Sequence, residues 1–129
     1  ETRVAVLNAA NSTGGDIAIA NTVGAPGPLD ITGIANAGGG NVFISNAGNT
    51  ATGQGITVSG PITATGGTAG ITVASGSPLV VSADMTAAGA ILLTAAETAA
   101  AGDDLTVNSG LTLESTGLSV TLRAGKFTR

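Results

Sequence analysis

The 129-residue sequence contains no cysteine, histidine, tryptophan or tyrosine, and only two phenylalanines. Without histidine and cysteine, the chain cannot build Ser-His or Cys-His nucleophile systems, the usual zinc ligand sets, or haem and thiolate clusters. Disulfides are excluded too, so cysteine does not indicate the compartment, although a chain without thiols suits an oxidising exterior. These absences exclude most classes of enzyme, and we expect a protein without catalytic activity and without a cofactor.

Positive charge is confined to the ends of the chain, since the only basic residues are Arg3, Arg123, Lys126 and Arg129. The body between them, residues 4–122, holds no cation but seven of the eight acids. Nucleic-acid binding needs Lys or Arg spread over a face, and anionic lipids attract basic anchors beside a membrane. We therefore expect no nucleic-acid partner and no membrane insertion. The body also offers trypsin-like proteases no cleavage site, which suits a secreted or cell-surface protein.

Large side chains are scarce, and small ones dominate. Gly (21), Ala (23), Ser (9) and Thr (19) together number 72, whereas Val, Ile, Leu and Phe number 31. These 31 residues are about a quarter of the chain, above the roughly 20% below which disorder is expected. The chain should therefore fold as a single domain of residues 1–129, around a narrow aliphatic core.

Short runs typical of β-strands recur along the whole chain, each bounded by Gly, Asn, Ser or Pro. Within most runs a large aliphatic residue alternates with Thr, Ser or Ala, which predicts one buried face. The predicted strands are Val4–Asn8, Asp16–Asn21, Leu29–Ile34, Asn41–Asn46, Ile56–Gly60, Pro61–Thr65, Ile71–Ser75, Leu79–Ala83, Ile91–Ala95, Leu105–Gly110, Leu111–Ser115 and Leu118–Leu122.

The alanine-rich segment Met85–Ala101 is the one place where a helix competes with a strand. Its alanine content supports a helix, but Gly89 and the run Ile-Leu-Leu-Thr favour a strand. The same region is the most membrane-like part of the chain, yet its apolarity is mostly alanine and it contains Glu97. We predict strand here, and no membrane span.

The runs are related to one another by an imperfect repeat. Strands that follow a Gly-containing turn begin near Ile17, Val42, Ile71, Ile91 and Leu118, at separations of 25, 29, 20 and 27 residues. Such a period, with two or three short strands per unit, predicts stacked coils in which every strand pairs with its counterpart above and below. We predict a right-handed parallel β-helix, or β-solenoid, of five or six coils, about 25 Å long at the usual strand spacing.

An antiparallel β-sandwich of the kind found in pilins is the alternative fold. It would join its strands by hairpins, but the chain lacks the Asn-Gly and Asp-Gly turns that mark two-residue hairpins. Asn8, Asn21, Asn46 and Asn108 follow predicted strands instead. Stacked asparagines at the corners of a solenoid would satisfy the backbone of the turns.

The repeat segments GGGNVFISNAG, GITVSGPITATGG, ADMTAAGAILLTAAE, AAGDDLTVNSGLTLESTG and LSVTLRAG resemble those of large secreted bacterial surface proteins. These are filamentous-haemagglutinin-like exoproteins and autotransporter passenger regions, and the resemblance covers roughly residues 4–125. It implies a right-handed parallel β-helix that acts as a stalk or an adhesive fibre outside the cell. We therefore expect a structural or adhesive element of an extracellular bacterial filament.

The candidate interface residues lie in the terminal strands. A solenoid exposes a strand edge at each end, and polar or helical caps usually cover such edges. Neither Val4–Asn8 nor Leu118–Leu122 has the pattern of a cap. We expect Val4, Val6, Leu118, Val120 and Leu122 to make axial contacts, either with flanking repeats of the same chain or with further copies stacked end to end.

The only adjacent pair of acids, Asp103 and Asp104, is the candidate metal site. Carboxylates in a turn suit calcium, but no calcium-binding loop motif surrounds this pair, and solvated turn residues are the simpler interpretation. An alternative function is a carbohydrate-binding or carbohydrate-active β-helix, with a host or surface glycan as partner, since a carboxylate pair can serve glycoside chemistry. A pilin-like fibre subunit is the second alternative.

Overall fold

The computed structural model describes residues 4–21, 27–46, 55–96 and 104–125. Within these ranges the chain forms short β-strands, as the alternating sequence pattern predicts. The strands are β1 (Val6–Asn11), β2 (Ile17–Ala20), β3 (Leu29–Asn36), β4 (Val42–Asn46), β5 (Ile56–Val58), β6 (Ile62–Ala64), β7 (Ile71–Ser75), β8 (Leu79–Val81), β9 (Met85–Ala87), β10 (Ile91–Ala95), β11 (Leu105–Val107), β12 (Leu113–Ser115) and β13 (Val120–Arg123).

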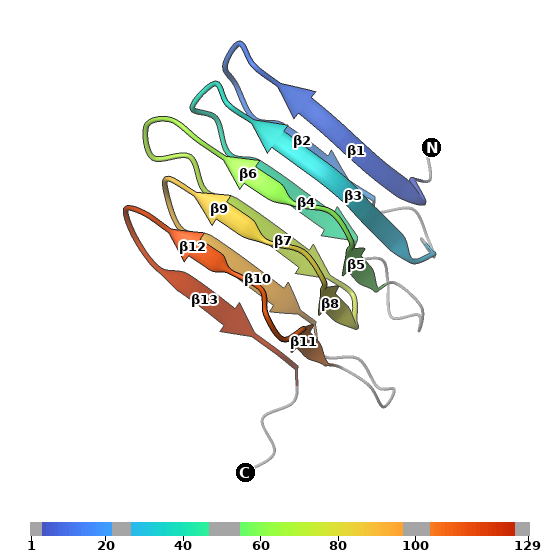
Figure 1. The fold of residues 1–129 in the computed structure, drawn as a ribbon. Helices are drawn as coiled ribbons and strands as arrows, with labels where there is room; N and C mark the ends of the chain where they lie inside the picture. The colour runs from blue at the N-terminus through green and yellow to red at the C-terminus, as the bar shows by residue number, and fades with distance from the viewer. Residues whose placement is uncertain (1–3, 22–26, 47–54, 97–103, 126–129) are drawn as a thin grey trace.

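The strands build two parallel sheets that the chain visits in turn (Figure 1). Sheet A has the order β11-β8-β5-β3-β6-β9-β12, with β1 also paired to β3, and sheet B has the order β13-β10-β7-β4-β2. Every strand pairing in the described part of the chain is parallel. The predicted all-β solenoid is confirmed, and the antiparallel sandwich is wrong.

The stack makes slightly fewer turns than predicted. Sheet B has five strands, so four steps separate β2 from β13, and the chain makes about four turns. At about 4.8 Å per step the described stack is roughly 19 Å from β2 to β13. These four turns join five levels of strands, and each level is called a coil below, numbered from the N-terminus.

The register of sheet B follows the repeat found in the sequence. Ile17, Val42, Ile71 and Ile91 lie in one column, as their spacing predicts. The fifth member is Val120, two residues beyond the predicted Leu118. Alternation along a strand has a period of two, so it cannot separate positions that differ by two residues.

The segment from Met85 to Ala95 contains two strands and no helix, so the preference for strand over helix is confirmed. It forms β9 and β10, which pair with β6 and β7 of the preceding coil. The run that becomes β9 was not among the predicted strands, because Met-Thr-Ala contains a single large apolar residue. Residues 97–101 lie outside the described part of the chain.

The core is a set of aliphatic columns that run along the stack between the two sheets. Inward side chains in the middle coils are completely or almost completely buried, while the outward positions between them are partly exposed. Three columns come from sheet A and two from sheet B: Leu29, Ile56, Leu79 and Leu105; Ile31, Val58, Val81 and Val107; Ile34, Ile62, Met85 and Leu113; Ile17, Val42, Ile71, Ile91 and Val120; Ile19, Ile44, Val73, Leu93 and Leu122.

Buried asparagines fill the corner where the chain leaves sheet B. The Nδ2 of Asn21 donates to the Oδ1 of Asn46 (2.9 Å) and to the carbonyl of Val4 (3.0 Å). The Nδ2 of Asn46 in turn donates to the carbonyls of Gly27 (3.0 Å) and Gly55 (3.1 Å). Both amides are almost fully buried. The predicted asparagine ladder is confirmed for this pair, because the side-chain amides supply the donors that the buried turn carbonyls need.

The other two predicted ladder members lie elsewhere. Asn8 is exposed within β1, and the Nδ2 of Asn108 donates to the hydroxyl of Ser82 (2.9 Å) at the surface. A second pair of asparagines, Asn11 and Asn36, occupies the corner where the chain leaves sheet A. The buried Asn36 Nδ2 donates to the carbonyls of Gly15, Gly40 and Asn41 at 2.9–3.1 Å.

Glycine is required where these turns stack on one another. A Cβ on Gly40 would overlap the carbonyl of Gly15 in the preceding coil. At this position the restriction is the close approach of two backbones, which a single methyl group would prevent.

We predict that Asn46→Ala lowers the free energy of unfolding by about 2–3 kcal/mol, because it leaves buried carbonyls without their donor and one N–H of the Asn21 amide without its acceptor. The matched control is Asn108→Ala, which removes one exposed hydrogen bond and should cost less than about 0.5 kcal/mol. Urea denaturation followed by circular dichroism measures both values. Equal losses for the two variants would contradict the structural role given to the buried ladder.

Candidate functional site: the end coils and the outer face of sheet B

The C-terminal coil, formed by β11, β12 and β13, leaves the end of the core open among the described residues. Val120 and Leu122 continue the columns of Ile91 and Leu93, but they are 39% and 48% exposed, whereas the two residues below them are fully buried. β13 pairs only with β10, so within the described structure its other edge has no strand beside it. This end therefore presents both an apolar surface and an unpaired strand edge, the two features that a further coil would cover.

Leu118 lies beside this end and not within a column. It belongs to the turn between β12 and β13 and is 69% exposed, and its N–H donates to the hydroxyl of Ser115 (3.0 Å). The structure thus brings two of the three C-terminal candidate residues, Val120 and Leu122, onto the open end of the core. It also adds Leu105, Val107 and Leu113, which are partly buried against the core.

The N-terminal coil, formed by β1 and β2, is open in the same way but exposes less. Val4 packs against the core and its N–H lies 3.5 Å from the Oδ1 of Asn21, whereas Val6 points out of sheet A and is 62% exposed. The inward residues of this coil are Leu7, Ala9, Ile17 and Ile19, of which only Leu7 is buried. None of these four residues is among the candidates predicted from the sequence, although strict alternation from Leu7 identifies Ala9 as the next inward position.

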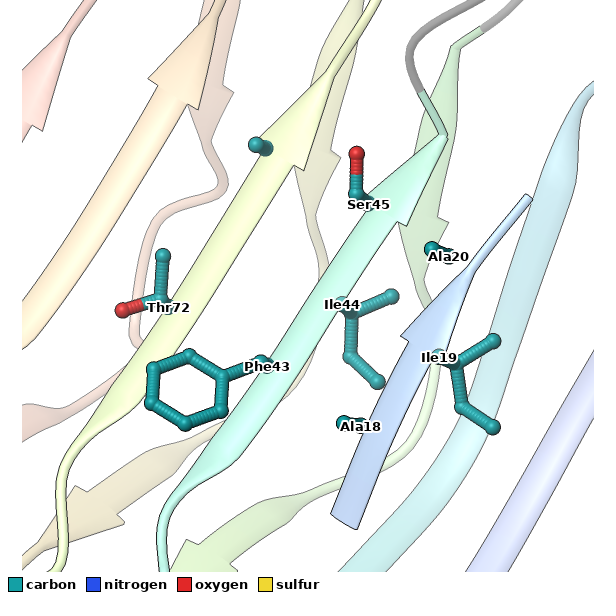
Figure 2. Close-up of a pocket in the computed structure, with 8 residues that line it drawn as sticks. Ala18, Ile19, Ala20, Phe43, Ile44, Ser45 and Thr72 are labelled. Atoms are coloured by element: carbon teal, nitrogen blue, oxygen red, sulfur yellow. The ribbon is translucent and has the colours of Figure 1, made fainter. Parts of the chain in front are cut away.

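The outer face of sheet B carries a shallow apolar depression beside Phe43 (Figure 2). Phe43 projects from β4 and is 42% exposed, with Ala18 and Thr72 as its register partners in the two neighbouring strands. β2, β4, β7 and β10 contribute no charged residue to this face, whereas Asp30 and Glu114 point outward from sheet A. The depression is lined by Ala18, Ile19, Ala20, Phe43, Ile44, Ser45, Thr72 and Ala74.

Three aspartates connect one coil to the next. The Oδ1 atoms of Asp16 and Asp84 accept backbone N–H bonds from Asn41 (2.7 Å) and Thr112 (2.8 Å), and Asp30 Oδ1 accepts the Ser59 hydroxyl (2.5 Å). Each carboxylate thus binds a donor in the following coil. These contacts give Asp16, Asp30 and Asp84 a role in stacking.

The predicted calcium pair is only half within the described structure. Asp104 is exposed and its backbone carbonyl accepts the N–H of Leu79 (2.9 Å), while Asp103 lies outside the described residues. Among the residues that the structure describes, no group of three or more Asp, Glu, His or Cys side chains could hold a metal ion. The described ranges also contain no helix of the length and apolarity that crossing a membrane requires.

No protein-family model matches the chain, and neither the curated proteins nor the solved structures contain a match.

We predict that Leu93→Ala and Leu122→Ala differ in their cost although they remove the same atoms from the same column. Leu93→Ala leaves a cavity in the closed core and should lower the free energy of unfolding by about 2–5 kcal/mol. Leu122→Ala removes a half-exposed side chain and should cost about 1 kcal/mol or less. Chemical denaturation measures both, and an equal cost would show that the C-terminal end of the core is covered in solution.

Proposed function

We propose that this protein is a structural or adhesive element of an extracellular bacterial filament. The observation that supports the proposal is that all five aliphatic columns reach the C-terminal end of the described stack, and that both columns of sheet B also reach its N-terminal end. Each added coil buries the side chains that the previous coil leaves exposed, so a solenoid of this kind gains length without needing a new core. The function follows from length and stiffness, and we assign no catalytic step to the chain.

The open ends can be covered in two ways. Flanking coils of the same polypeptide would extend the columns directly, whereas stacked copies would make a head-to-tail contact that repeats into an open fibre. We propose right-handed coiling, because connections between parallel strands of one sheet are right-handed in almost all proteins.

An extracellular location accords with the composition and the backbone pairing. A body without Lys or Arg offers trypsin-like proteases no site even when unfolded, and the chain has no thiol to oxidise. In the folded state the paired backbone and buried columns also hinder proteases of broader specificity, because cleavage requires local opening. Resistance to elastase, which cuts after small residues, therefore reports on the fold, while resistance to trypsin does not.

Immunogold electron microscopy of intact source cells tests the proposal. Antibodies against the purified chain should label filaments outside the cell envelope without permeabilisation. The matched control is the same serum after absorption with the purified chain. Label that appears only after permeabilisation, inside the cell, would overturn the proposed function.

The part of the outer face of sheet B that β2, β4, β7 and β10 form carries no charged residue, and this favours glycan binding as a second function. Phe43 offers an aromatic surface, and Ser45 and Thr72 offer hydroxyls beside it, which together suit a neutral sugar with apolar and polar faces. Such a contact would provide the adhesive part of the proposed role. The acids that point outward from sheet A make that face less suited to an acidic glycan.

We predict that Phe43→Ala abolishes binding of the chain to any neutral glycan it retains on an array, while the melting temperature falls by no more than about 3 °C, because the ring is half-exposed. Phe43→Tyr keeps the aromatic surface and should keep binding within about threefold. If the native chain retains no glycan, or Phe43→Ala binds as well as the native chain, the second function is wrong.

A further inference from the structure

The bend in sheet A changes size from one coil to the next. Each coil crosses sheet A in two parts, for example β5 and then β6 in the third coil. A few residues separate the last inward residue of the first part from the first inward residue of the second part, and we call these residues the corner of sheet A. Their number rises along the chain from one to five, as the strand register shows: Asn8 in the first coil, Thr32 and Gly33 in the second, Ser59 to Pro61 in the third, Ser82 to Asp84 in the fourth, and Asn108 to Thr112 in the fifth.

The two ends of the solenoid consequently differ in shape. The first coil crosses sheet A as one strand, β1, whereas the last coil crosses it as β11 and β12 with a five-residue corner between them. The corner of the last coil also directs Leu111 against the core. Figure 1 shows this change as a single long arrow at the N-terminal end and two short arrows at the C-terminal end.

A second copy stacked head to tail would have to match these unequal corners. The corner in β1 of the second copy has one residue, whereas the corner of the last coil has five. The difference of four residues corresponds to about 13 Å of extended chain. This β1 could pair with β11 or with β12 in register, but not with both. Within the described stack, neighbouring corners differ by at most two residues, and they never become shorter along the chain.

Sheet B imposes no such restriction. β2 and β13 are both four residues long, and each places two inward aliphatic residues in the same two columns. The shape of the corner in sheet A therefore decides which coil the C-terminal end accepts.

We propose that the C-terminal coil is a docking surface for a further coil of matching shape. Such a coil, called a wide coil below, has three parallel strands, inward aliphatic residues and a corner of about five residues in sheet A. The N-terminal coil of a second copy does not fit this surface. This inference rests on the proposed structural role. Of the two ways to cover the C-terminal end, it favours a flanking wide coil over the stacking of identical copies.

Matched fusions test the inference. Arg123 pairs with Thr94, so a second copy of residues 96–124 placed directly after Ala124 enters the next coil in register. The narrow variant has the same insertion but lacks residues 109–112 in the added copy, which leaves a one-residue corner like that of the first coil. The third fusion carries serine at the inward positions of the added copy, those of Leu105, Val107, Leu113, Val120 and Leu122.

The wide fusion should raise the melting temperature by on the order of 5 °C, since an added repeat contributes its interface to a linear stack. It should also slow amide exchange of residues 120–123 by about tenfold or more. The narrow and serine fusions should do neither. Equal stabilisation by the wide and narrow fusions, or none by the wide fusion, would overturn the inference.

The unmodified chain provides a second test. Sedimentation at rising concentration should show a monomer, and chains of copies joined end to end would contradict the inference. That result would leave the proposed filament role intact, because immunogold labelling tests that role separately.

Discussion

Stacking of parallel strands in register is the interaction on which the rest of this structure depends. Each coil is too thin to bury its own aliphatic residues, because its two sheets enclose only a few inward side chains. When Ile71 lies on Val42 and Ile91 lies on Ile71, each side chain is covered from both sides along the axis. The backbone hydrogen bonds of the sheets and the burial of the columns form together, so neither exists in a single coil.

The polar parts of the structure serve the same constraint. Tight corners bring backbone carbonyls into the interior, where a group without a partner is costly. Asn21 and Asn46 supply donors at one corner, and Asn11 and Asn36 supply them at the other. The small residues that dominate the composition have a related cause, because stacked turns approach so closely that Gly40 has no room for a methyl group.

The proposed function depends on the aliphatic side chains and strand edges that stacking leaves exposed at the ends. Inside the stack the columns are closed, and at Val120 and Leu122 they are open. A fold held by nearest-neighbour contacts has a natural way to continue, which a closed globular core lacks. The corner of sheet A widens along the chain, so the two ends of the stack differ in shape and are not interchangeable.

Much of this architecture could be predicted from the sequence. Alternation of aliphatic with small residues predicted most strands, and the recurrence at Ile17, Val42, Ile71 and Ile91 predicted their parallel stacking. These features are local or periodic, so they can be recognised without knowing the three-dimensional structure. The absence of histidine, cysteine and interior cations likewise led, from composition alone, to the expectation of a protein without catalytic activity and without a nucleic-acid partner.

Only the tertiary structure decided the register and the exposure of the ends. A pattern of period two made Leu118 and Val120 equivalent, and contact with Ile91 selected Val120. The same pattern could not show that Val6 points outward while Leu7 closes the core, or that five residues form the last corner. Alternation determines which residues share a face, but the neighbouring coil determines which face is inside and how far each strand is shifted, because those choices depend on contacts between residues about 25 positions apart in the chain.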